Sequence, residues 1–112
     1  MTREEKIKYW IELSIEDLKA GETLLQGGHY LYVGFMCHQA IEKIMKGYFV
    51  KLIDEIPPFT HDLVMLASKG DFYSSFTENQ KDFIRQLNPL HIKARYPEYK
   101  DRIYRQLTKE VC

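Results

Sequence analysis

Histidine and carboxylate side chains at helical spacing are the groups in this sequence best suited to acid–base or ligand chemistry. His38 and Glu42 are four residues apart, which places them on one face of a helix. His61 and Asp62 follow later in the chain and add further donors. A metal site in a helical bundle needs matching histidine and carboxylate donors from several helices. His61 and Asp62 are the only further candidates for such donors in the sequence. We therefore predict no metal site, and instead a buried polar network that links His38, Glu42 and His61.

Four other side chains could contact phosphate. Lys43 and Lys46 lie on the same predicted helix as His38, where they either meet phosphate or are simply solvated. Arg95 and Tyr96 precede a proline near the end of the chain. They could bind phosphate and stack on a base, or they could fix the last helix in place. We favour the structural role for this second pair.

The composition is that of one soluble globular domain spanning residues 1–112. Sixteen basic residues balance sixteen acidic ones, which argues against a polycation. Two cysteines make no disulfide framework, no basic-apolar leader follows Met1, and the apolar runs are too short for a bilayer. We therefore expect a cytoplasmic protein with no membrane contact. No phosphate-binding loop or dinucleotide fingerprint is present, and no cofactor is expected.

The apolar residues recur with helical periodicity along nearly the whole chain. They predict an all-α, up-and-down bundle of four to five helices, two long ones at the N-terminus followed by shorter ones. The expected helices cover about 4–26, 30–53, 61–68, a fourth that begins after Thr77 and breaks at Asn88-Pro89, and 98–110. Because the last helix is much shorter than the first two, apolar surface is left that a second subunit could cover.

Local signals set the ends of these helices. Gly27-Gly28 should end the first helix with a left-handed stop, and Thr60 should cap the third. Thr77 and Gln80 have the spacing of a capping box at the start of the fourth. The buried side of that helix is expected to consist of Phe83, Ile84 and Leu87.

Four stretches together resemble the HEPN domain, a family of small helical bundles. In chain order they are WIELSIEDLKA from Trp10, HQAIEKIMK from His38, THDL from Thr60 and ARYP from Ala94. The resemblance covers about residues 10–99. It implies a homodimer that is paired, in prokaryotic two-component systems of the toxin–antitoxin kind, with a minimal nucleotidyltransferase. It also implies a possible ribonuclease that needs no metal.

The active motif of such ribonucleases is an arginine followed, after four to six residues, by a histidine, and Arg85 with His91 is the match here. The resemblance implies that His91 acts as the acid–base at the ribose 2′-hydroxyl, which attacks the phosphate. Arg85 would hold that phosphate and offset the charge that builds on it.

The sequence departs from the active pattern at two positions. Gln86 stands where a small polar or acidic residue is usual, and Lys93 stands where a tyrosine is often found. The ARYP element is also common in family members that lack a working motif. The alternative is therefore a non-catalytic HEPN dimer that binds a nucleotidyltransferase partner, a nucleotide or RNA.

Overall fold

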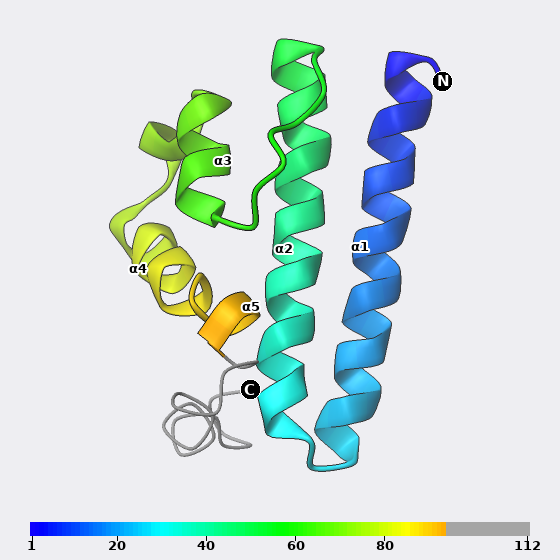
Figure 1. Ribbon diagram of the computed structural model, residues 1–112, viewed down its shortest axis with the longest axis vertical. Helices are drawn as coiled ribbons and strands as arrows, with labels where there is room; N and C mark the ends of the chain where they lie inside the picture. Colours follow the sequence, from blue (N-terminus) through cyan, green and yellow to red (C-terminus); the bar gives the residue numbers. More distant parts are fainter. Residues whose placement is uncertain (94–112) are drawn as a thin grey trace.

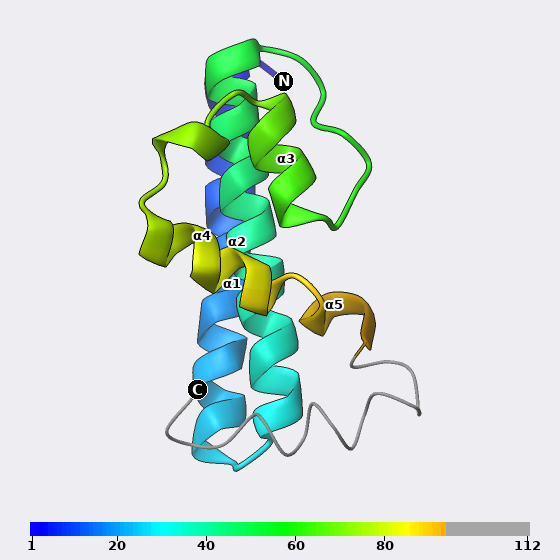
Figure 2. The same ribbon diagram turned by 90° about the vertical axis from the view of Figure 1, so that its left-hand side faces the viewer.

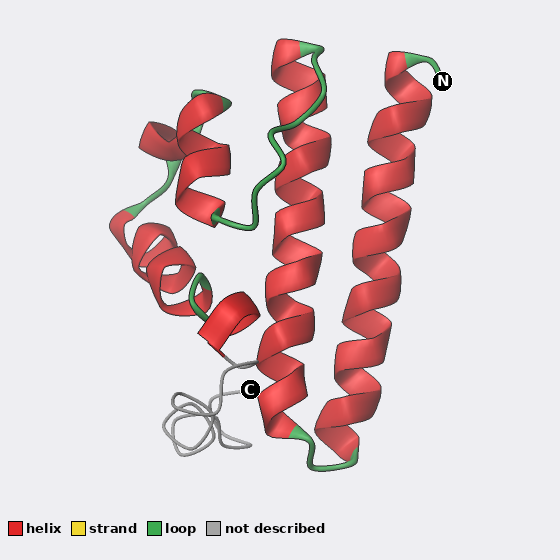
Figure 3. Ribbon diagram, viewed as in Figure 1, coloured by secondary structure: helices red, strands yellow, loops and turns green. Residues whose placement is uncertain are grey.

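The computed structural model describes residues 1–93, with side chains through His91 (Figure 1). Two long antiparallel helices come first, α1 (Arg3–Gln26) and α2 (Tyr30–Ile53). Shorter elements follow: α3 (Leu63–Lys69), the 3-10 helix η1 (Tyr73–Ser75), α4 (Glu78–Leu87) and α5 (Leu90–Lys93). Every element within residues 1–93 is helical (Figure 3), which confirms the predicted all-α bundle. The expected helix over 98–110 lies outside the described residues.

The α1–α2 hairpin is determined by local sequence. Thr2 and Glu5 form a capping box at the start of α1. Gly28 adopts a φ of 78° after its end, which confirms the predicted left-handed stop. Gly47 allows the two helices to approach closely, because a Cβ there would lie 3.2 Å from the Cβ of Trp10.

The shorter helices cover one side of α2. Figure 2 shows α3 alongside the upper half of α2, with α4 running across it and α5 near its lower half. Their apolar side chains meet α2 in a single core of buried residues: Met45, Leu63, Leu66, Ala67, Phe72, Ile84 and Leu87. This core fixes where the segment before α3 and the segment after α4 meet α2.

Two local expectations were wrong. Asp62, and not Thr60, caps α3, because its carboxylate accepts hydrogen bonds from the backbone N–H groups of Val64 and Met65. Phe83 is exposed, whereas Ile84 and Leu87 are buried as expected. The capping box of Thr77 and Gln80 at the start of α4 is present as predicted.

An apolar stripe lies on the outer surface of α1. Ile11, Ile15 and Leu18, spaced four and three residues apart, are all exposed, and we call them the α1 stripe. No helix within residues 1–93 has the length and apolar character that crossing a membrane requires.

Candidate functional site

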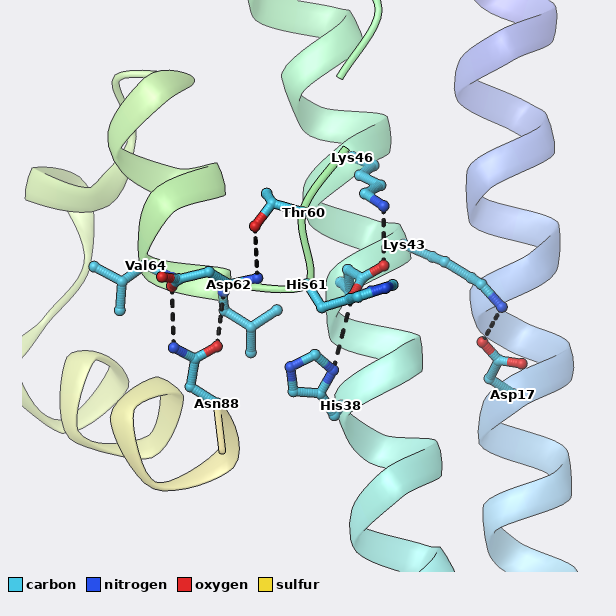
Figure 4. Close-up of polar contacts among 11 residues, drawn as sticks. Asp17, His38, Lys43, Lys46, Thr60, His61, Asp62, Val64 and Asn88 are labelled. Carbon is cyan, nitrogen blue, oxygen red and sulfur yellow. Dashed lines mark hydrogen bonds and ion pairs between the residues drawn. The ribbon is translucent and has the colours of Figure 1, made fainter. Parts of the chain in front are cut away.

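A buried carboxylate on α2 is the centre of the polar cluster. Glu42 is 3% exposed. Its Oε1 lies 2.8 Å from His61 Nδ1 and its Oε2 lies 2.9 Å from Lys46 Nζ. His38 Nδ1 is 3.8 Å from Oε1, and Figure 4 shows His38 and Lys46 on α2 with His61 reaching toward them from the segment before α3. The structure thus brings together His38, Glu42 and His61, with Lys46 as a further member.

Helical spacing explains three of these positions. His38, Glu42 and Lys46 follow one another at four-residue intervals, so they share one face of α2. His61 comes from the segment that precedes α3, far from α2 in sequence. Its contact with Glu42 therefore depends on how the chain enters α3.

Asn88 fixes that entry from the end of α4. Its Oδ1 accepts a hydrogen bond from the Leu63 backbone N–H at 2.8 Å, and its Nδ2 donates to Asp62 Oδ1 at 3.0 Å (Figure 4). From the sequence, Asn88 is predicted only as part of a helix break. The signal that could have found this role is the amide itself, since Asn carries both a donor and an acceptor at a helix end.

His91 packs on the same cluster. It is 4% exposed, and its ring stacks on that of His61 with the centroids 3.8 Å and the planes 23° apart. The centroid of His38 is 5.0 Å away and that of Phe35 is 5.4 Å away. The break at Pro89 lets α5 return toward α2, which carries this imidazole into the core beside Glu42.

Arg85, the predicted partner of His91, has other neighbours. Its side chain is 50% exposed and its guanidinium donates hydrogen bonds to the Asp82 carboxylate and, at 3.1 Å, to the Tyr73 hydroxyl. The hydrogen bond that Arg85 donates to the Asp82 carboxylate raises the pKa of Arg85 further, so the guanidinium stays charged. Arg85 thus lies on the surface among α4 and η1, while His91 lies against α2.

The two lysines that were expected to contact phosphate each meet a carboxylate. Lys43 Nζ pairs with Asp17 Oδ2 across the α1–α2 interface at 2.5 Å. Lys46 pairs with Glu42, is 12% exposed, and lies 5.6 Å from the centroid of the Trp10 ring. Arg95 and Tyr96 lie outside the described residues.

Burial and hydrogen bonding set the protonation of the cluster. The pKa of His38 is lowered because burial disfavours its charged form; Glu42, the His61 backbone and the Asn88 side chain oppose this without overcoming it. Burial alone would raise the pKa of Glu42, but hydrogen bonds from Lys46 and His61 outweigh it and the pKa is lowered. At neutral pH His38 is therefore neutral and Glu42 is ionised.

The cluster also has the donors of a metal site. One donor atom each from Glu42, His61 and His91 lie within 4.8 Å of one another. These donors come from α2, the segment before α3, and α5. No metal site was predicted, because the sequence gives no indication that His91 returns to α2.

The protein is an all-α bundle. Its second long helix, α2, carries a histidine, a glutamate and a lysine on one largely buried face. The family model of the HEPN domain matches residues 7–112, and the chain belongs to the HEPN family. This confirms the resemblance found in the sequence. No curated protein and no solved structure matches the chain.

Proposed function

We propose that this protein is the HEPN component of a prokaryotic two-component system, a homodimer that binds a minimal nucleotidyltransferase without cleaving RNA. The observation that carries this proposal is the setting of His91. A general acid–base must come within hydrogen-bond reach of the proton that it transfers. The His91 ring is 4% exposed and lies among the rings of His61, His38 and Phe35, so a ribose hydroxyl has no direct access to it.

Arg85 supports the same conclusion. Its guanidinium already pairs with Asp82 and Tyr73, and a phosphate would have to compete with the Asp82 carboxylate for it. An arginine that holds a scissile phosphate offers its fork of N–H donors to that phosphate. The surface position of Arg85 fits a contact with a protein partner, since arginine is enriched at such interfaces.

The α1 stripe supports the homodimer. Exposed Ile11, Ile15 and Leu18 form a continuous apolar row on a long straight helix. Contiguous exposed apolar patches are typical of protein interfaces. Packing two α1 helices against each other across a two-fold axis would bury both rows, because such an interface uses the same patch on each subunit.

A ribonuclease that needs no metal, cutting RNA by attack of the 2′-hydroxyl through Arg85 and His91, is the second candidate. What favours it is His61, which covers His91 and is itself 52% exposed. A rotation of the His61 side chain toward solvent would uncover His91. Arg85, half-exposed and charged, would then supply the cation.

The test combines partner binding with RNA cleavage. The genes beside its own are searched for a minimal nucleotidyltransferase, with which the protein is co-expressed and purified for light scattering and for cleavage assays in EDTA. We expect a stable complex, a dimer that Ile15→Glu dissociates and Glu22→Lys does not, and no cleavage at any protein concentration. Cleavage that His91→Ala and Arg85→Ala abolish, and that His29→Ala leaves intact, would refute the non-catalytic assignment in favour of the ribonuclease.

A further inference from the structure

Three potential metal ligands from distant parts of the chain converge in the core. Their donor atoms lie within 4.8 Å of one another, and two of the three residues, Glu42 and His91, are buried. We propose that Glu42, His61 and His91 form a binding site for a divalent transition metal of the zinc type. This site is independent of the proposed nucleotidyltransferase binding.

The distances are close to those of a bound ion. Zinc lies about 2.0–2.2 Å from imidazole nitrogen and carboxylate oxygen, so two ligands of a tetrahedral site are about 3.4 Å apart. Glu42 Oε1 and His61 Nδ1 are already 2.8 Å apart, held by the hydrogen bond between them. The widest of the three separations, which is at most 4.8 Å, has to shrink by about 1.4 Å. The His61 ring also has to rotate out of its stack on His91, because the lone pairs of two nearly parallel rings do not point at one ion. His61 has room for that rotation because its side chain is half-exposed.

The charges in the cluster favour a cation. The Glu42 carboxylate is ionised and buried, and Lys46 binds only its Oε2. Lys46 therefore orients the Glu42 carboxylate through Oε2 and leaves Oε1 facing the histidines. Residues that hydrogen-bond to metal ligands without touching the metal commonly orient those ligands in this way. On binding, the proton that His61 carries on Nδ1 in its hydrogen bond to Glu42 moves to Nε2 or leaves to solvent.

His38 supplies a second observation. Its side chain is fully buried, and neither ring nitrogen makes a hydrogen bond of normal geometry with the described residues. The ring interacts with the His61 backbone and the Asn88 side chain. A bound ion or its water would add the partner of good geometry that buried polar atoms nearly always have. Its Nδ1 faces Glu42 Oε1 at 3.8 Å (Figure 4). As a neutral ring it can ligate the ion directly or accept a hydrogen bond from water bound to it.

The donor set decides the class of metal. Imidazole nitrogens with a single carboxylate suit zinc, cobalt and nickel, whereas magnesium and calcium require sets of oxygen ligands. Glu42, His61 and His91 would fill three of the four positions of a tetrahedral zinc site. Because His61 is half-exposed, water can reach the fourth position. Because the ligands come from α2, the segment before α3 and α5, the ion would join these three parts.

The experiment is a titration of untagged, EDTA-treated protein with Zn²⁺ by calorimetry, and with Co²⁺ by visible absorption. We expect one ion per chain and the ligand-field bands of cobalt bound by nitrogen. Losing even an outer partner of a metal ligand costs about 10–100-fold in affinity, so His61→Ala and His91→Ala should each weaken binding at least tenfold. His29→Ala is the matched control, because His29 is exposed and lies outside the cluster.

A second variant guards against misfolding. Glu42→Gln keeps the side-chain shape while it removes the charge, and circular dichroism establishes that each variant is folded. At free zinc a hundredfold above the dissociation constant, we expect the Tm of the wild type to rise by about 10 °C. The proposal is overturned if the wild type binds no Zn²⁺, if Mg²⁺ binds equally well, or if His29→Ala loses as much affinity as the cluster variants.

Discussion

Replacing Glu42 by alanine tests the energetic centre of the fold. The substitution removes the carboxylate that pairs with Lys46 and with His61. Breaking a buried ion pair by removing one partner costs about 3–5 kcal/mol, because the other charge stays buried without compensation. Lys46 is 12% exposed and can partly reach water, which places the expected loss near the lower limit, about 3 kcal/mol.

Two comparisons isolate the cause of that loss. Glu16 and Lys19 form an exposed ion pair on α1, so Glu16→Ala should cost less than about 0.5 kcal/mol. The double variant Glu42→Leu/Lys46→Met removes both charges of the buried pair. It should recover most of the stability, because well-packed apolar residues commonly replace a buried ion pair without loss.

The assay is urea unfolding followed by circular dichroism, in EDTA so that metal binding does not contribute. A loss of 3 kcal/mol corresponds to a fall in Tm of about 12 °C for a domain of this size. The reasoning is refuted if Glu42→Ala costs no more than Glu16→Ala. It also fails if the double variant is no more stable than Glu42→Ala, since the loss would then not arise from the uncompensated charge of Lys46.

Three further predictions concern pH and packing. His38 and Glu42 both have folded pKa values below their ordinary ones, so the free energy of unfolding should be highest above about pH 6.5 and fall as the pH is lowered. Urea midpoints measured at a series of pH values test this. In Glu42→Gln, the loss of stability at acidic pH should be smaller, because the variant has no carboxylate to protonate at this position. Gly21→Ala should stabilise α1 by about 0.5–1 kcal/mol, as an added Cβ makes only an ordinary contact there. Gly47→Ala should show no such gain, because its Cβ would lie 3.2 Å from that of Trp10, and thermal melts of the two variants decide the point. Leu66→Ala should cost about 2–5 kcal/mol in urea unfolding, since Leu66 is fully buried; a smaller cost would mean that α3 is not part of the core.

The local structure could be predicted from residues that lie close together in the chain. The extents of α1 and α2 follow from apolar periodicity, and Gly28 ends the first of them because glycine adopts positive φ without strain. The capping box of Thr77 and Gln80 likewise depends on residues three positions apart. The spacing that placed His38 and Glu42 on one face is of the same kind.

The contacts between distant segments depend on tertiary packing and could not be predicted from local sequence. Thr60 and Asp62 are both suitable N-caps, and the choice of Asp62 is reinforced by Asn88 from the far end of α4. His91 stacks on His61, whereas Arg85 pairs with its helical neighbour Asp82. The physical reason is that spacing along a helix fixes which side chains share a face. Which faces then meet depends on how the core packs and on the direction in which the chain leaves the break at Pro89.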